Sequence, residues 1–251
     1  MGYNPFSLNG KTILITGASS GIGKETAIEC SKLGASVIII GRNKERLQEA
    51  FDSLQTSDVQ SHFQFTVELT NEEEVKNLVS NLPKLDGLMQ SAGKGLTLPM
   101  QFASKEKLAE IFDINLFSQV ELLRLLFKKK LLNKEASVVL VASLGGTHVF
   151  SPGNGPYGAT KAALNAVMRY CAKEFAPRKV RVNSICPGMV DTPLIHRGTI
   201  SEEQLQEDAK KYPLKRYGKP EDIAHLAAFL LGDASSWITG QDFVIDGGIS
   251  I

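Results

Sequence analysis

Residues 12–23 read Thr-Ile-Leu-Ile-Thr-Gly-Ala-Ser-Ser-Gly-Ile-Gly, and this stretch decides the fold. A short β-branched run ends at Thr16, and three glycines then open a helical pattern at about residue 22. Glycines let the backbone turn tightly and approach a pyrophosphate, whose charge then sits at the N-terminus of the helix. The spacing is Gly-x-x-x-Gly-x-Gly, and its place between a strand and a helix predicts dinucleotide binding.

Strand and helix patterns alternate along the rest of the chain. Alternation of this kind predicts an α/β fold with a doubly wound parallel sheet and helices on both faces. Strands are expected at 12–16, 36–40, 62–68, 87–91, 137–142, 181–186 and 242–245. Helices are expected at 22–33, 43–55, 71–81, 104–132, 156–175 and 220–231. We expect one domain over residues 1–251, with the polar segment 189–218 as a lid over a site.

Composition excludes several other classes of protein. The 251 residues carry a net charge of +1, which is not the footprint of a protein that binds nucleic acid or an anionic membrane. No apolar run is long enough for a membrane span, and the start lacks the pattern of a signal peptide. The three cysteines are widely spaced without a Cys-x-x-Cys, so we expect no metal site, no disulfide framework and a reducing, cytoplasmic compartment.

Tyr157 and Lys161 lie four residues apart in Tyr-Gly-Ala-Thr-Lys. In a helix this spacing puts both side chains on one face, about 5–6 Å apart at Cβ. A neighbouring ammonium favours phenolate and is expected to lower the pKa of the tyrosine, which then exchanges a proton near neutral pH. In a chain with 5 Tyr, about 0.4 such pairs arise by chance, so the surrounding motifs must decide.

The end of the second expected strand bears on the coenzyme. An Asp or Glu there favours NAD, because it accepts from the ribose 2′-hydroxyl. This chain instead has Gly41-Arg42-Asn43, and a guanidinium can bind a 2′-phosphate. We therefore expect NADP(H) rather than NAD(H); the alternative is that Arg42 is a solvated residue at the start of the next helix.

Taken together, the chain resembles a single-domain short-chain dehydrogenase/reductase over about residues 8–248. The matching motifs occur in the order of that family: Thr16–Gly23, Asp113-Ile114-Asn115, Ser143, Tyr157–Lys161, Arg181-Val182-Asn183, Pro187-Gly188 with Thr192, Ile238-Thr239-Gly240 and Asp246-Gly247-Gly248. The resemblance implies a Rossmann-type, seven-stranded, three-layer α/β/α fold. It also implies a nicotinamide cofactor and a homotetramer or homodimer.

The resemblance assigns four catalytic residues. Tyr157 would be the acid/base, and Lys161 would lower its pKa and bind the nicotinamide ribose. Ser143 would bind the substrate oxygen. Asn115 would bend its helix and hold a water that links the lysine to solvent. The structural alternatives are a turn serine at Ser143 and a helix-surface residue at Asn115.

The same resemblance gives the cofactor contacts, with two departures from the pattern. The contacts besides Arg42, Asn43, Tyr157 and Lys161 are Gly17, Ser19, Ser20, Gly21, Ile22, Gly23, Glu68, Leu69, Ser91, Ala92, Gly93, Pro187, Gly188, Val190 and Thr192. Ser91 stands where the family often has Asn, so bonds in the central sheet are expected to rearrange. Glu68 stands where the family has Asp, and it can still accept from the adenine amine. Thr192 could instead be a helix N-cap.

The substrate is less determined. The pattern is nearest to 3-oxoacyl-[acyl-carrier-protein] reductases, in which Lys134 and Arg178 would correspond to docking residues for the acidic carrier protein. The substrate would be a small-molecule carbonyl or alcohol, or an acyl-carrier-protein thioester. Two alternatives are a dehydrogenase of a sugar, polyol or steroid-like alcohol that uses NAD, and a non-catalytic NADP-binding sensor on the same fold.

Overall fold

Seven parallel strands form one sheet in the computed structural model, which describes residues 4–197 and 201–251. The strand order is β3-β2-β1-β4-β5-β6-β7, so the expected doubly wound, seven-stranded fold is confirmed. The strands are β1 Thr12–Thr16, β2 Ser36–Gly41, β3 Phe63–Thr66, β4 Leu85–Gln90, β5 Leu132–Val141, β6 Arg181–Pro187 and β7 Asp242–Ile245.

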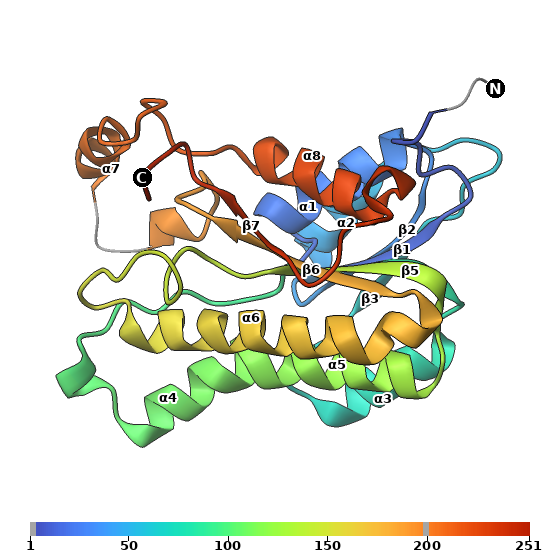
Figure 1. The fold of residues 1–251 in the computed structure, drawn as a ribbon, viewed down its shortest axis with the longest axis horizontal. Coiled ribbons are helices and arrows are strands. Elements are labelled where there is room, and N and C mark those ends of the chain that lie inside the picture. The colour runs from blue at the N-terminus through green and yellow to red at the C-terminus, as the bar shows by residue number, and fades with distance from the viewer. Residues whose placement is uncertain (1–3, 198–200) are drawn as a thin grey trace.

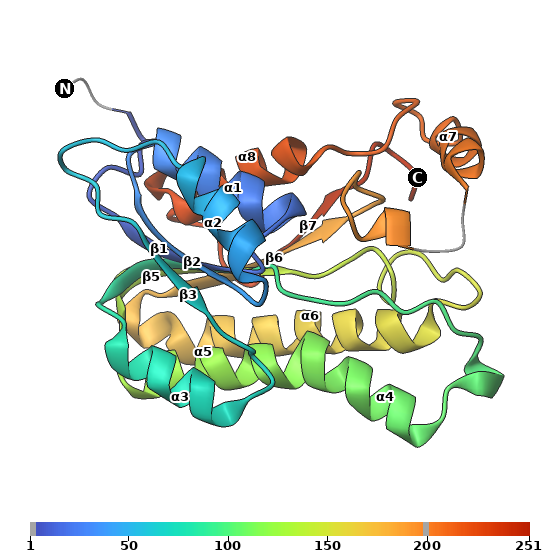
Figure 2. The same ribbon diagram turned by 180° about the vertical axis from the view of Figure 1, so that it is seen from behind.

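Helices cover both faces of the sheet and make three layers (Figures 1 and 2). On one face lie α1 Gly21–Lys32, α2 Lys44–Asp52 and α8 Pro220–Leu231. On the other lie α3 Glu72–Asn81, α4 Lys105–Phe112, α5 Ser118–Lys128 and α6 Gly155–Phe175. The expected lid holds α7 Glu202–Ala209 and a 3-10 turn, Ile195–Arg197; its residues 198–200 lie outside the described residues. The other 3-10 turns are Met100–Phe102, Ala176–Arg178 and Asp233–Ser235.

The apolar strands serve two cores at once. In β1, Leu14 belongs to the core beneath α3, α5 and α6, whereas Ile13 and Ile15 belong to the core beneath α1 and α8. Successive strand side chains point to opposite faces, which is why doubly covered strands read as unbroken apolar runs. Each fully buried Leu or Ile contributes roughly 1.5–3 kcal/mol relative to an exposed one. These two cores stabilise the sheet through its faces, so residues at the ends of the strands are not needed for core packing and can bind ligands.

The expected single helix over 104–132 is wrong in two respects. A π-helical turn, Asp113–Phe117, separates α4 from α5, and α5 ends at Lys128. Lys130 then adopts a left-handed conformation with φ of 55°, and β5 begins at Leu132, five residues before the expected start. Leu132 pairs with Leu85 of β4, and the register shifts between Leu85 and Gly87. A tertiary strand pairing has therefore overridden a leucine-rich pattern that is typical of a helix.

The chain order of the strands reverses between β1 and β4, which lie side by side in parallel register. At such a switch point the loops that leave the two strands diverge to opposite faces and open a crevice. The carboxyl ends of β1 and β4 therefore mark where a ligand site is expected. No helix in the described part of the chain is long and apolar enough to cross a membrane.

Candidate active site

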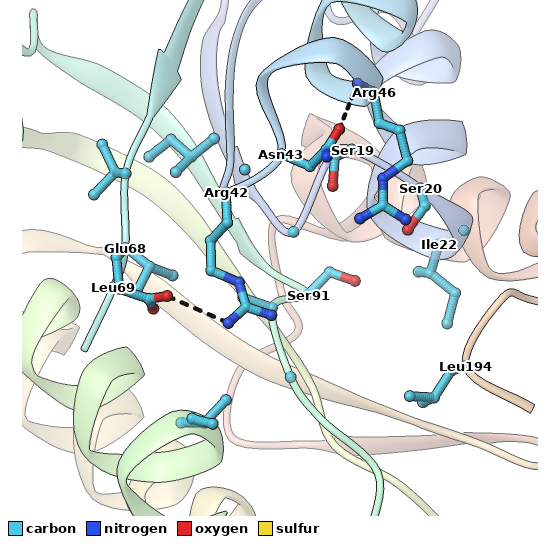
Figure 3. Close-up of a pocket in the computed structure, with 18 of the residues that line it drawn as sticks. Ser19, Ser20, Ile22, Arg42, Asn43, Arg46, Glu68, Leu69, Ser91 and Leu194 are labelled. Carbon is cyan, nitrogen blue, oxygen red and sulfur yellow. Dashed lines mark hydrogen bonds and ion pairs between the residues drawn. The ribbon is translucent and has the colours of Figure 1, made fainter. Parts of the chain in front are cut away.

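A pocket of about 550 Å³ opens at the carboxyl ends of β1 to β4 (Figure 3). This volume is typical of a small-molecule or cofactor site. Thirteen of the expected cofactor contacts line it: Gly17, Ser19, Ser20, Gly21, Ile22, Arg42, Asn43, Glu68, Leu69, Ser91, Ala92, Gly93 and Thr192. The structure therefore brings together residues from five separate segments of the chain.

The glycine loop has the shape that a phosphate needs. Gly17 has a φ of +68°, and a Cβ there would stand 2.7 Å from the backbone nitrogen of Ala92. Gly23 does not line the pocket; a Cβ at Gly23 would stand 2.5 Å from the Gly17 carbonyl oxygen, so it packs the helix onto the loop. Larger residues would push the loop away from the sheet.

The N-terminus of α1 is open to an anion. Among the described residues, α1 has no side-chain cap from Ser20 and no acidic residue in its first turn. By contrast, Asn43 caps α2 and Asn71 caps α3. Uncapped amides at the positive end of a helix dipole bind phosphate well. A dinucleotide pyrophosphate thus fits the loop, which supports the cofactor expected from the sequence.

The other end of the pocket carries two arginines. Arg42 points across the pocket, and its Nη1 lies 3.3 Å from Glu68 Oε2 (Figure 3). Arg46 also lines the pocket, on the side of Ser20. Sequence reasoning missed Arg46, which lies in the first turn of α2, three residues after the N-cap Asn43. A 2′-phosphate would meet a positive environment here.

The expected catalytic residues gather beyond this pocket. Ser143 follows the end of β5, and α6 begins at Gly155, with Pro156 in its first turn. The helix then presents Tyr157 and Lys161 on one face, and Lys161 Nζ lies 5.8 Å from the centroid of the Tyr157 ring. The Ser143 hydroxyl lies near the Tyr157 phenol and, as a hydrogen-bonding group, favours its ionised form. Two hydroxyl groups are thus placed to hold one substrate oxygen.

The pKa expected for the tyrosine is corrected by this geometry. Burial raises the pKa of Tyr157 above its ordinary value, and the hydrogen bond with Ser143 opposes this only in part. Burial also lowers the pKa of Lys161 to about 8. The Lys161 ammonium donates to the Val141 carbonyl at 2.8 Å instead of to the phenol. Desolvation of the phenolate is therefore the dominant influence on this pKa.

Asn115 lies in the π-helical turn and is fully buried. Its Oδ1 accepts from the Lys94 N–H at 2.8 Å, and its Nδ2 donates to the Lys94 carbonyl at 2.9 Å. A Cβ at Gly93 would stand 3.2 Å from Asn115 Oδ1 and 3.6 Å from Lys161 Nζ. Asn115 thus holds the loop after β4, and Lys161 lies beside the same loop. The alternative that Asn115 is a helix-surface residue is wrong.

The departure at Ser91 is accommodated nearby. The backbone N–H groups of Ser91 and Ala92 donate to Thr16 Oγ1 at 3.2 and 3.3 Å. The buried Gln119 donates to the Ala92 carbonyl at 2.8 Å, and Gln90 donates to the Gln119 carbonyl at the same distance. These two glutamines were not identified from the sequence. They hold the loop after β4 without an asparagine at position 91.

The remaining expected contacts lie around the lid. Pro187 accepts from the Leu144 N–H at 3.1 Å, which joins the ends of β5 and β6. Gly188 donates to Ile245, and Val190 forms a bridge with Gly218. Pro187, Gly188, Val190, Tyr157 and Lys161 do not line the 550 Å³ pocket. Thr192 does: its methyl would stand 3.1 Å from a Cβ at Gly21, so the lid meets the glycine loop.

The two basic residues expected to dock a carrier protein lie elsewhere. Lys134 is near the start of strand β5, nine residues before Ser143. Nine residues correspond to roughly 30 Å along a strand. Arg178 donates to the carbonyl of Leu132, where β5 begins, and lies over the Phe127 ring at 5.6 Å. In Figure 1 this end of α5 and α6 is opposite to the start of α6. Neither residue borders the site within one chain.

No three His, Cys, Asp or Glu side chains in residues 4–197 and 201–251 are arranged to hold a metal ion. Cys30, Cys171 and Cys186 are free thiols.

Known proteins are similar to this chain over nearly its whole length. The family model described as enoyl-(acyl carrier protein) reductase matches residues 17–250. The 3-oxoacyl-[acyl-carrier-protein] reductase FabG of Rickettsia felis is 37% identical over 246 residues, which cover 96% of this chain and 98% of the relative.

Two solved structures share the fold over nearly the whole chain. A short-chain type dehydrogenase/reductase from Mycobacterium ulcerans is 32% identical, with a TM-score of 0.86, over 97% of this chain and 91% of that one. A putative NAD(P)-dependent gluconate 5-dehydrogenase from Beutenbergia cavernae, with NADP bound at low occupancy, is 29% identical with a TM-score of 0.86, over 98% and 99% of the two chains. The chain thus belongs to the short-chain dehydrogenase/reductase family and is an oxidoreductase that acts on CH–OH and C=O groups.

Proposed function

We propose that this protein is an NADP(H)-dependent oxidoreductase that interconverts a carbonyl and a secondary alcohol. One observation carries the proposal. The paired hydroxyls of Ser143 and Tyr157 stand beside a pocket that has an uncapped helix N-terminus for phosphate and two arginines beyond it. This arrangement combines proton transfer with a nucleotide site.

The roles of the four catalytic residues follow from their surroundings. A bound nicotinamide would supply or accept the hydride. Ser143 and Tyr157 hold the carbonyl oxygen, and Tyr157 gives its proton to the developing alkoxide. Burial raises the pKa of Tyr157, so the phenol carries the proton that reduction of a carbonyl requires.

Lys161 and Asn115 support this proton transfer. With a pKa of about 8, Lys161 is about nine-tenths protonated at pH 7. Its ammonium therefore stands ready to balance negative charge on Tyr157 once a proton has left. Asn115 fixes the loop that covers the lysine by bonding both backbone groups of Lys94.

The coenzyme is proposed as NADP(H) on two grounds. The end of β2 has no carboxylate for a ribose 2′-hydroxyl, and Arg42 and Arg46 both line the adenosine end of the pocket. Guanidinium groups bind phosphate through paired hydrogen bonds. The structural relative from Beutenbergia cavernae holds NADP, which agrees with this choice.

For the substrate, we propose a 3-oxoacyl thioester, because full-length relatives at 37% identity are named 3-oxoacyl-[acyl-carrier-protein] reductases. Lys134 and Arg178 lend no support, since they lie at the other end of the sheet. A sugar or polyol acid is the second candidate, because a gluconate 5-dehydrogenase shares the fold over nearly the whole chain. Homotetramer or homodimer assembly and a cytoplasmic location stay predictions.

Turnover of a defined set of compounds tests this function. Acetoacetyl thioesters, 5-ketogluconate and simple ketones are incubated with NADPH or NADH, and absorbance of the reduced nicotinamide is followed. We expect thioester reduction with NADPH to be fastest. Faster reduction of 5-ketogluconate would replace the substrate proposal, and equal rates with NADH would remove the coenzyme proposal.

A further inference from the structure

Arg42, at the end of β2, is already paired with a carboxylate at the end of the neighbouring strand β3. Its Nη1 lies 3.3 Å from Glu68 Oε2, and 60% of the Arg42 side chain and 39% of the Glu68 side chain are exposed (Figure 3). Both residues line the pocket. The cation that would bind a 2′-phosphate is therefore paired with a negative charge of the protein itself.

Glu68 is held in place by its own backbone surroundings. Its Oε1 accepts from the Thr70 N–H at 3.3 Å, and its backbone N–H donates to Glu74 Oε2 at 2.8 Å. Asn71 caps α3 immediately afterwards. The Thr70 N–H thus favours this position of the carboxylate, and an anion that binds Arg42 must either displace the carboxylate or lie beside it.

Arg46 is in a different situation. It lines the same pocket from the first turn of α2, where its backbone N–H donates to Asn43 Oδ1. Within residues 4–197 and 201–251, no hydrogen bond or ion pair is recorded for its guanidinium, which points toward the side of Ser20 (Figure 3). The pocket thus contains one arginine bound to a carboxylate and one arginine without such a partner.

We infer that Glu68 is a specificity-determining residue, which competes with the 2′-phosphate of NADP(H) for Arg42 and so limits how strongly the enzyme prefers NADP(H) over NAD(H). This inference rests on the proposed coenzyme. Arg46 then supplies the cation that meets the phosphate without competition. Glu68 has the opposite effect on a nucleotide without the phosphate, because its carboxylate can accept from ribose or adenine donors.

The size of the effect follows from the exposure of the pair. An exposed ion pair is weak, so the phosphate can break it, and repulsion between Glu68 and a phosphate in a half-open pocket is moderate. Removing the carboxylate charge should tighten binding of a 2′-phosphate by about three- to tenfold, and salt should reduce the gain.

Calorimetric titration of the ligand-free protein separates this effect from catalysis. The probes are adenosine 2′,5′-bisphosphate and 5′-AMP, which differ only in the 2′-phosphate. The variants are Glu68→Gln, Arg42→Ala and the double variant. Glu73→Gln is the control, because Glu73 is an exposed carboxylate of the same helix start that does not line the pocket.

We expect Glu68→Gln to tighten the bisphosphate three- to tenfold, to leave 5′-AMP unchanged or weaker, and to have no such effect when Arg42 is alanine. Unchanged or weaker bisphosphate binding in Glu68→Gln, or equal tightening of both probes, would overturn the inference. Glu68→Ala repeats the test should Glu68→Gln lower the unfolding temperature. If the wild-type protein does not prefer the bisphosphate over 5′-AMP, the proposed coenzyme is wrong. In that case a preference for the bisphosphate that appears in Glu68→Gln would still support the role of Glu68, and its absence would overturn it.

Discussion

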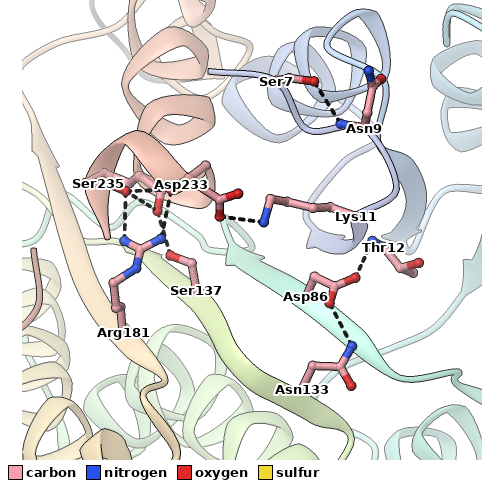
Figure 4. Close-up of polar contacts among 12 residues, drawn as sticks. Ser7, Asn9, Lys11, Thr12, Asp86, Asn133, Ser137, Arg181, Asp233 and Ser235 are labelled. Carbon is pink, nitrogen blue, oxygen red and sulfur yellow. Dashed lines mark hydrogen bonds and ion pairs between the residues drawn. The ribbon is translucent and has the colours of Figure 1, made fainter. Parts of the chain in front are cut away.

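The two ends of the sheet use polar residues in opposite ways. At the carboxyl end, the glycine loop and Arg46 line an open pocket, and the hydroxyls of Ser143 and Tyr157 lie beyond it. At the amino end, polar side chains are bonded to one another and to the backbone (Figure 4). The same strands therefore carry a binding site at one end and cross-links at the other, and substitutions at the two ends should have separable effects.

At the amino end, hydrogen bonds from polar side chains link neighbouring strands and the segment after α8. Asp86 of β4 accepts from the Thr12 N–H at 2.9 Å and from Asn133 at 2.7 Å, which ties β1, β4 and β5 together (Figure 4). Arg181 of β6 is nearly buried and donates to Ser235 Oγ and to the Gly232 carbonyl at 2.8 and 3.0 Å. Buried polar groups with partners stabilise a fold, whereas those without partners are costly.

The largest effect is expected at the carboxyl end. Tyr157→Phe removes the phenolic proton but keeps the ring, so turnover should fall by about 10²–10⁴-fold. The thermal unfolding midpoint should change little, because one hydrogen bond with Ser143 contributes only about 1 kcal/mol. Steady-state kinetics and calorimetry on the same preparation measure both.

Tyr170→Phe is the matched control for this substitution, because Tyr170 is an exposed residue of the same helix α6. It should leave turnover unchanged. If Tyr157→Phe kept near-normal turnover, or lost activity only in proportion to lost folded protein, the carboxyl end would not control turnover separately from stability.

The next effect is expected at the amino end and on stability alone. Asp86→Ala leaves the Thr12 N–H and the Asn133 amide without their acceptor, which should cost about 1–3 kcal/mol. For a chain of this size the unfolding midpoint should fall by roughly 2–10 °C. Activity per folded molecule at 25 °C should be unchanged, because Asp86 lies at the far end of β4 from Ser91.

Lys11→Ala provides a comparison on the same edge. Lys11 Nζ pairs with Asp233 at 2.7 Å, but 74% of the Asp233 side chain is exposed (Figure 4). Exposed ion pairs contribute about 0–1 kcal/mol, so this variant should lower the midpoint less than Asp86→Ala. An equal fall in both would mean that Asp86 is no more than a surface contact.

Local signals in the sequence predicted much of this arrangement. The glycine run 17–23 and the pair Tyr157 and Lys161 depend on spacing within one turn or one loop. The structure places the run between β1 and α1 and the pair in α6. Three features depended on contacts between distant segments. The pairing of Leu132 with Leu85 set the start of β5, burial raised the pKa of Tyr157, and the pairing of β2 with β3 brought Glu68 to Arg42.

The lid differs from both ends of the sheet, because its polar link depends on a side chain that titrates, His196. His196 Nε2 lies 2.7 Å from Asp191 Oδ1 and its Nδ1 lies 2.8 Å from Glu202 Oε1, so the ring donates to both carboxylates only as the imidazolium. These hydrogen bonds raise the pKa of His196. The contribution of these hydrogen bonds to lid stability is therefore complete below the unfolded pKa of about 6.5 and is lost as pH rises through the higher folded pKa.

His196→Gln should remove this pH dependence of lid stability. Because the site is exposed, we expect the rate of proteolysis of the lid to change by only about two- to threefold. The measurement is the rate of tryptic cleavage at Lys210 and Lys211 in wild type divided by the rate in His196→Gln, at a series of pH values. The division cancels the protease's own pH dependence. A ratio that rises with pH supports the ionic link, and a flat ratio would show that the protonation of His196 does not stabilise the lid.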